Sequence, residues 1–139
     1  MDEIRQFDFW LGEWKLTWEG GEGRNLIESE FDGRVIVERF DGRPAIPLRG
    51  ISVSVYDVGA GVWRQTWADS NGRYLDFVGG MRDREMDLRR AGRHEGQPAL
   101  FRMLWHEIST DSLRWNWEFT TDGAKAWQTL WAIAYKRLE

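Results

Sequence analysis

Turn signals recur about every eight to twelve residues along this chain, and that spacing leaves no room for long helices. The intervening runs are short and rich in β-branched and aromatic residues, as in Arg49–Tyr56 and Val62–Ala68. Strands of this length, separated by turns at this spacing, are typical of a sandwich or a barrel. The pattern therefore predicts an all-β fold.

Two dipeptides mark tight hairpins within this pattern. Asp32-Gly33 and Asn71-Gly72 both favour the left-handed backbone conformation that two-residue hairpin turns require. The two prolines of Asp41–Leu48 predict a loop, because proline cannot serve inside a central ladder. Ten strands are expected, at Glu13–Trp18, Asn25–Phe31, Arg34–Phe40, Arg49–Tyr56, Val62–Ala68, Arg73–Val78, Arg84–Arg90, Ala99–Ile108, Leu113–Phe119 and Ala126–Arg137, with a further loop at Ala91–Pro98.

The connections between these strands decide the architecture. Short connections favour antiparallel pairing of consecutive strands. Ten strands in a chain of 139 residues would leave two exposed edges unless the sheet closed on itself. The predicted fold class is an all-β, antiparallel up-and-down β-barrel of about 8–10 strands, formed by residues 1–139 as one domain. Residues 2–11 have a rough helical period and predict a short N-terminal helix that ends at Gly12.

Charge and composition argue against several classes of function. The formal net charge is −4 and basic residues form no tract, so no nucleic-acid partner is expected. The chain has no cysteine, which excludes disulfides, thiolate metal ligands and a cysteine nucleophile. The first residues are charged, and no segment approaches the roughly 20 apolar residues of a membrane helix. The expectation is a cytoplasmic protein without a signal peptide or a membrane partner.

Tryptophan is unusually frequent, with ten residues in 139. Its side chain is large and rigid, and its single N–H group needs a partner when it is buried. Ten such side chains suit two different interiors. They can fill the centre of a small barrel, or they can line a pocket with rings, and the count alone leaves both open.

The segment Asp8–Trp14, Asp-Phe-Trp-Leu-Gly-Glu-Trp, resembles the opening of lipocalin-like (calycin) proteins. In those barrels a short helix precedes a Gly-x-Trp, whose Trp closes one end, and a basic residue late in the last strand packs over its ring. The resemblance implies this barrel-closing role for Gly12, Trp14 and Arg137, with Lys136 as the second candidate for the basic residue. An arginine over an indole is stabilised by a cation–π interaction of about 0.5–2 kcal/mol.

The chain is also similar to a bacterial family of uncharacterised proteins with a Phe-Trp-Leu-Gly-x-Trp start. Phe9–Trp14, Trp63–Trp67 and Asp122–Trp127 carry this similarity, and they match the family's opening motif, its central Trp-Arg-Gln-x-Trp and its late Asp-Gly-x-x-x-Trp. The resemblance implies a lipocalin-like fold and brings no activity with it. Heme-binding, nitrobindin-like relatives supply a histidine near the chain's end, whereas Trp131–Arg137 has none, so no cofactor is expected.

Strand parity predicts which side chains face the interior, because successive side chains of a strand point to opposite faces. On each of four strands, we predict that the face with most of the aromatic residues points inward. The residues of these faces are Trp14, Leu16 and Trp18; Trp63, Gln65, Trp67 and Asp69; Leu113, Trp115, Trp117 and Phe119; and Trp127, Thr129, Trp131, Ile133 and Tyr135.

The resulting interior is aromatic with a few polar groups, namely Gln65, Thr129, Tyr135 and Asp69. Mostly apolar walls with sparse polar groups are typical of small-molecule sites. These polar side chains have a structural alternative, in which they bond only to one another or to buried water. The expected ligand-binding residues are Trp63, Gln65, Trp67, Trp105, Trp115, Trp117, Trp131 and Tyr135.

The inward faces of strands 73–79 and 99–108 stay open at this stage. Phe101, Met103 and Trp105 are expected inside the barrel. The opposite choice would bring Arg102 and His106 into the interior and would favour an anion-binding or acid–base role.

The sequence assigns no metal ligands and no catalytic residues. His94 and His106 are the only two histidines and lie far apart in the chain, so a metal site is not expected. His106-Glu107 begins like a zinc motif but lacks a second histidine four residues on, and it lies on a predicted strand.

Three functions fit these observations. The first is a carrier or sensor that binds a small hydrophobic or aromatic molecule in the barrel and has no titratable pair inside. The second is a cofactor-independent lyase- or cyclase-type enzyme, which needs at least two inward ionisable groups within hydrogen-bonding reach, from among Arg102, Tyr135, Asp76 and His106. The third is a filled-barrel protein-interaction module. Pairing into a homodimer also stays open, and no exposed apolar stripe is predicted.

Overall fold

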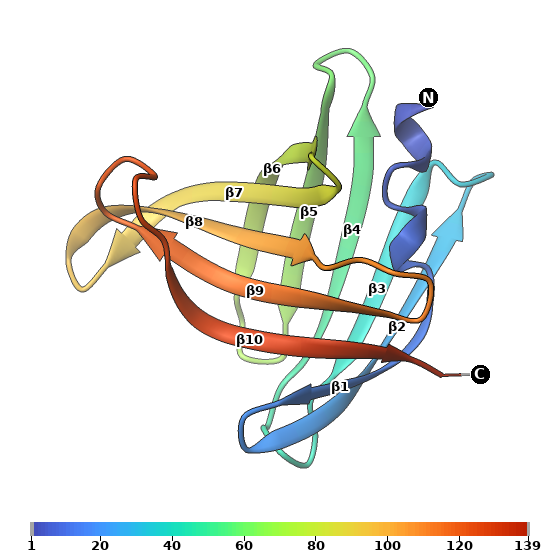
Figure 1. The fold of residues 1–139 in the computed structure, drawn as a ribbon, viewed down its shortest axis with the longest axis horizontal. Coiled ribbons are helices and arrows are strands. Elements are labelled where there is room, and N and C mark those ends of the chain that lie inside the picture. Colours follow the sequence, from blue (N-terminus) through green and yellow to red (C-terminus); the bar gives the residue numbers. More distant parts are fainter. Residues whose placement is uncertain (1, 139) are drawn as a thin grey trace.

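A computed structural model describes residues 2–138 and contains ten strands preceded by two short 3₁₀ turns (Figure 1). The elements are η1 (Glu3–Arg5), η2 (Asp8–Trp10), β1 (Gly12–Trp18), β2 (Gly21–Glu30), β3 (Val35–Asp41), β4 (Arg49–Asp57), β5 (Val62–Asp69), β6 (Tyr74–Arg82), β7 (Glu85–His94), β8 (Gln97–His106), β9 (Ser112–Thr120) and β10 (Gln128–Arg137). No helix in this part of the chain is long and apolar enough to cross a membrane.

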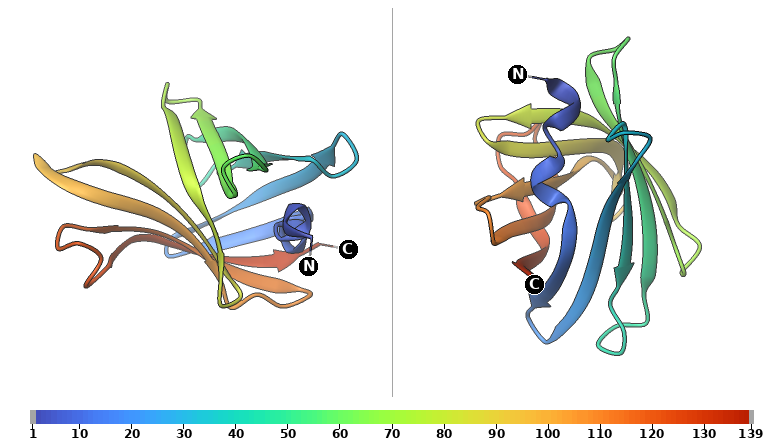
Figure 2. Two further views of the ribbon diagram at one scale, coloured as in Figure 1. Left: turned by 90° about the horizontal axis from the view of Figure 1, so that it is seen from above. Right: turned by 90° about the vertical axis from the view of Figure 1, so that its right-hand side faces the viewer.

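The sheet is a closed up-and-down barrel, which confirms the predicted fold class. Every strand pairs antiparallel with its neighbour in sequence, and β1 also pairs antiparallel with β10. The closing register runs from Trp14 opposite Arg137 to Thr17 opposite Ala134. Figure 2 shows the strands strongly inclined to one another, with both chain ends on the same side of the molecule. Closure removes the two exposed edges that an open ten-stranded meander would have.

Each predicted strand overlaps an observed one, and the short N-terminal helix is present, but one loop prediction was wrong. Ala91–Pro98 was expected to be a loop, whereas β7 and β8 run through most of it and Arg93 pairs with Pro98. The turn needs only Glu95 and Gly96, which both have positive φ, as a tight two-residue turn between antiparallel strands requires. The expected N-terminal helix is two separate 3₁₀ turns.

The last strand carries the main error in the predicted inward faces. A β-bulge between Thr129 and Trp131 shifts the register of β10 against β9. A bulge inserts one residue, so the parity of the strand changes across it. Trp131 and Tyr135 therefore line the interior, as expected. Trp127 and Thr129 do not, because Trp127 covers Arg102 on the outer face and Thr129 bonds the Glu118 carboxylate there.

One end of the barrel is filled by aromatic rings from the 3₁₀ turns. Phe7 and Trp10 are fully buried and stack on each other with their ring centroids 4.8 Å apart. Phe7 also meets the rings of Trp63 and Trp105 edge-on, at 5.3 and 5.0 Å. The indole N–H of Trp63 donates to the side-chain oxygen of Gln6. We call Phe7, Trp10, Trp63 and Trp105 the end cluster.

Gly12, Trp14 and Arg137 form the junction between the end cluster and the sheet. The guanidinium of Arg137 lies 4.1 Å from the centre of the Trp14 ring, which is the stacking that the lipocalin-like resemblance implied. Arg137 also donates to the backbone oxygens of Leu11 and Thr110, at 2.6 and 2.9 Å. Gly12 has φ +128°, and a Cβ atom there would overlap the Arg137 guanidinium. A glycine is required here for both its conformation and its small size.

The outer face of β4 is more apolar than the sequence analysis predicted. Ile51, Val53 and Val55 point outward and are substantially exposed, whereas Ser52 and Ser54 between them are buried inside the barrel. An exposed apolar stripe therefore exists on this strand, although none was expected. The usual association of apolar residues with the interior is reversed along β4.

Candidate ligand-binding cavity

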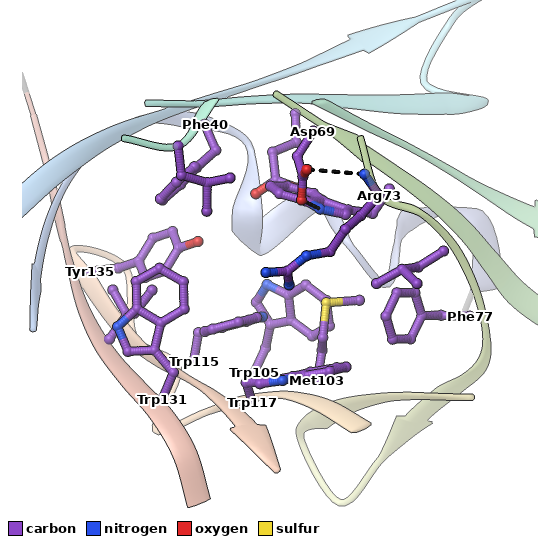
Figure 3. Close-up of a pocket in the computed structure, with 15 residues that line it drawn as sticks. Phe40, Asp69, Arg73, Phe77, Met103, Trp105, Trp115, Trp117, Trp131 and Tyr135 are labelled. Carbon is purple, nitrogen blue, oxygen red and sulfur yellow. Dashed lines mark hydrogen bonds between the residues drawn. The ribbon is translucent and has the colours of Figure 1, made fainter. Parts of the chain in front are cut away.

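The half of the barrel away from the end cluster contains a cavity of about 110 Å³ (Figure 3). A buried water occupies roughly 10–15 Å³ on this measure, so the space suits a molecule of on the order of ten non-hydrogen atoms. Eight of the fifteen lining residues carry aromatic rings. These rings belong to Phe40, Trp67, Phe77, Trp105, Trp115, Trp117, Trp131 and Tyr135.

The rings around the cavity pack against one another and leave its centre open. Trp131 meets Trp18, Phe40 and Trp115 edge-on, with ring centroids 5.4, 6.1 and 5.8 Å apart. Trp117 stacks on Phe101 at 5.3 Å. Offset and edge-on pairs at these separations are favourable arrangements of aromatic rings. The wall is therefore held in place without a ligand.

A buried polar cluster lies against the inner part of the cavity and centres on the Glu38 carboxyl group. Asn25 donates from Nδ2 to Glu38 Oε2 at 2.7 Å and to the Tyr135 hydroxyl oxygen at 2.9 Å. Ser52 donates from Oγ to Glu38 Oε1 at 2.7 Å. Glu38 and Tyr135 both line the cavity and are almost completely buried. The cluster holds one carboxyl group at a fixed place in an otherwise aromatic wall.

Burial changes the protonation of this cluster. Burial raises the pKa of Glu38 above its ordinary value, and the hydrogen bonds from Ser52 and Asn25 only partly oppose that effect. The pKa of Tyr135 is also raised, first by burial and then by the nearby Glu38 charge, so its hydroxyl stays protonated. Neutral forms are favoured because a dry interior disfavours charge.

The rim of the cavity carries two opposite charges where β5 turns into β6. The Asp69 carboxylate accepts from the Trp67 indole N–H at 2.8 Å and from the backbone N–H groups of Asn71 and Arg73. Burial raises the pKa of Asp69, but these hydrogen bonds outweigh it and hold the pKa below its ordinary value. The Arg73 side chain, although exposed, points from the turn into the cavity (Figure 3).

Six of the eight expected ligand-binding residues line this cavity. They are Trp67, Trp105, Trp115, Trp117, Trp131 and Tyr135. The other two lie deeper. Trp63 belongs to the end cluster, and Gln65 donates to Ser54 inside the barrel without reaching the cavity wall. Gln65 thus follows the structural alternative in part, because its amide N–H bonds a neighbouring side chain while its Oε1 atom receives no hydrogen bond from residues 2–138.

The open question about β8 is resolved by the register. Phe101, Met103 and Trp105 are inward, while Arg102 lies on the outer face. There it bonds Glu118 at 2.7 Å and Asp87 at 3.3 Å and lies under the Trp127 ring. His106 and Asp76 are likewise outward, so of the four acid–base candidates only Tyr135 faces the cavity.

Sequence reasoning missed Glu38 and its two hydrogen-bond donors, Asn25 and Ser52. The pairing of residues between neighbouring strands contains the signal that identifies them. Ser52 pairs with Trp67 across β4 and β5, and with Glu38 across β3 and β4. Directly paired residues share a face, so an inward Trp67 places Ser52 and Glu38 inside as well.

Comparison of the chain with protein-family models and with curated proteins finds no match. The class is therefore defined by the fold: a closed ten-stranded antiparallel barrel, compatible with a lipocalin-like architecture, with an aromatic cavity at one end.

Proposed function

We propose that this protein binds a small apolar or aromatic molecule inside the barrel, as a carrier or a sensor. The observation that carries the proposal is the cavity of about 110 Å³ walled by eight aromatic rings. Pre-formed concave sites with apolar walls and a few polar groups are where proteins bind small molecules. The resemblance of Asp8–Trp14 to the opening of lipocalin-like proteins supports the same function.

The cavity also weighs against a filled barrel that acts only through its exterior. In the end cluster the rings are in contact and leave no space. A filled barrel would have the same packing throughout. Instead the wall rings contact each other sideways and leave their inner surfaces to the cavity.

A cofactor-independent enzyme of the lyase or cyclase type is the second candidate, and one observation favours it. Glu38 and Tyr135 are two inward ionisable groups that accept hydrogen bonds from the same Asn25 amide. A carboxyl group and a phenol in a dry cavity are suited to proton transfer. Conversion of a bound molecule over time, followed by mass spectrometry, distinguishes this enzyme from a carrier.

The test is native mass spectrometry of the purified protein, followed by titration with indole and 1-naphthol while tryptophan fluorescence is recorded. We expect saturable binding of these aromatic probes. Leu75→Trp should abolish binding because Leu75 lines the cavity, whereas Val78→Trp on the outer face of the same strand should leave it unchanged. Circular dichroism checks that both variants fold. No adduct and no saturable response to either probe would overturn the proposal.

A further inference from the structure

We propose that the ligand is an organic cation, an ammonium group attached to a small apolar or aromatic body, with Glu38 as its counter-ion. This inference rests on the proposed binding function and names its ligand class. Three independent features of the cavity favour a positive charge: the donor and acceptor balance of the polar cluster, the charge distribution of the wall, and the position of Arg73.

The polar cluster contains hydrogen-bond acceptors that the described part of the chain leaves unfilled. Asn25 uses its Nδ2 group on Glu38 and Tyr135, and Ser52 uses its hydroxyl on Glu38. The Asn25 Oδ1 atom is buried and receives no hydrogen bond from any residue in 2–138. A cation bound beside Glu38 would favour the ionised form of its carboxyl group, and an ionised carboxylate can accept more hydrogen bonds than the two that Glu38 receives. Of these acceptors, the Glu38 carboxyl group lines the cavity, so a ligand that donates hydrogen bonds, as an ammonium group does, would use its remaining accepting capacity.

The wall also favours a cation electrostatically. The faces of aromatic rings carry partial negative charge, and cations bind over them, most strongly over tryptophan. Five of the eight rings around the cavity are tryptophans. The charged residues of the wall are two carboxylates, Glu38 and Asp69, against the single guanidinium of Arg73. An aromatic cage with an excess of carboxylates attracts an ammonium ion and repels an anion.

Arg73 shows that a cation is accommodated in this cage. Its side chain extends from the β5–β6 turn into the cavity, as Figure 3 shows. Within residues 2–138 its guanidinium forms no ion pair with a carboxylate within 4.0 Å and no hydrogen bond. Because Arg73 is exposed at a turn, it can swing outward when a ligand enters. The guanidinium therefore competes with the positively charged group of the ligand for the same place in the cavity.

The test compares three probes of similar size, by isothermal calorimetry on the intact protein. They are benzylammonium, its neutral carbon isostere ethylbenzene, and the anion phenylacetate. We expect the cation to bind at least tenfold tighter than the neutral isostere and the anion to bind weakest. This comparison needs no variant, so it does not depend on the folding of a mutant.

Variants then assign the effect to Glu38. Glu38→Gln keeps the shape of the side chain and should remove most of the preference for the cation over the neutral isostere. Glu28→Gln is the matched control, because Glu28 is an exposed carboxylate on the outer face of β2. It should leave the preference unchanged. Arg73→Ala should strengthen cation binding severalfold by removing the competing guanidinium, and its backbone contacts to Asp69 are retained.

The outcomes separate this inference from the proposed function. Equal or tighter binding of the neutral isostere overturns the cation proposal and leaves the binding function intact. Tightest binding of phenylacetate, lost in Arg73→Ala, would show that Arg73 recognises an anion and would also overturn it. A failure of all three probes, together with indole and 1-naphthol, counts against the binding function itself.

Discussion

The two halves of the barrel interior use the same side chains in opposite ways. In the end cluster, Phe7 and Trp10 stack at 4.8 Å, and both meet Trp105 edge-on. Around the cavity, Trp131 meets Trp115 edge-on and Trp117 stacks on Phe101, and both tryptophans border an open space. Trp105 belongs to both halves and forms the boundary between them.

The 3₁₀ turns cause this difference. They bring Phe7 and Trp10 into one end of the barrel and fill the space there, and within residues 2–138 no corresponding 3₁₀ turn lies at the other end. A barrel of ten strands is wide enough to leave room for a ligand unless something plugs it. Tryptophan content therefore does not by itself distinguish a packed core from a binding site. The distinction depends on whether a segment of the chain fills the interior.

The largest effect expected is on stability, at the end cluster. Trp10→Ala should lower the free energy of unfolding by about 3–5 kcal/mol, because it removes a fully buried ring and leaves a void. Trp131→Ala should cost less than half as much, since this ring already borders an open space. Urea denaturation of both variants checks the ranking, and equal losses would contradict the division of the interior.

At the junction of the end cluster, Gly12→Ala should cost about 1–3 kcal/mol. The change places a side chain at φ +128° and against the Arg137 guanidinium. Gly20→Ala is the matched control, because Gly20 also has a positive φ but a Cβ there meets no atom within 4 Å. A double-mutant cycle with Arg137→Ala should recover part of the Gly12→Ala loss, and strict additivity would rule out the steric overlap.

In the cavity wall, a substitution should change ligand affinity more than it changes stability. Trp115→Phe keeps an aromatic ring and should change the free energy of unfolding by under about 1 kcal/mol. Its affinity for an aromatic probe should nevertheless fall severalfold, because the larger ring is part of the binding surface. Thermal denaturation and probe titration on one sample measure both quantities. Unchanged affinity would exclude Trp115 from the site.

The smallest effect is a pH dependence of stability that originates at Glu38. Burial raises its pKa in the folded state, so the unfolded chain releases this proton first as the pH rises. The stabilisation of the neutral carboxyl is complete below the ordinary pKa of 4.5 and is lost as the pH passes the raised value. The Tm of Glu38→Gln should therefore rise relative to the Tm of the wild type as the pH increases from below 4.5 through the raised pKa of Glu38.

Other charged and titratable groups face the same cavity, and the Glu38→Gln comparison separates them from Glu38. Asp69 has a lowered pKa, so its contribution is lost as the pH falls, with the opposite sign. Tyr135 has a raised pKa and stays protonated, and the Arg73 guanidinium also faces the cavity. All three are present in both proteins, so they cancel in the difference. A constant difference in Tm across the range would contradict the assignment to Glu38.

The fold was largely predictable because its signals are local. Tight turns such as Asn71-Gly72 fix the strand boundaries, and closure follows from short connections between many strands. The Gly12-x-Trp14 motif likewise identified Arg137, near the other end of the sequence, as the residue that packs over the Trp14 ring. Aromatic side chains identified most of the cavity wall, since they are rarely placed on an exposed face of a small barrel.

The polar part of the site was missed because hydrophobicity is a poor guide to the inward face of β3 and β4. Ile51 and Val53 suggest a buried face, yet they point outward, while Ser52 and Glu38 point inward. Only cross-strand register shows this arrangement. The bulge near Thr129 was missed for a related reason, because a single inserted residue leaves no mark in the alternation that precedes it.

The central claim is that only one half of the interior binds a ligand, and the ten indole N–H groups report on it residue by residue. A ¹⁵N–¹H spectrum is recorded while benzylammonium and indole are titrated separately. The account predicts that the signals of Trp67, Trp115, Trp117 and Trp131 shift, while those of Trp10, Trp14, Trp63 and the outer Trp127 stay in place. Shifts confined to the end cluster or to Trp127, or no shift with either probe, would contradict it.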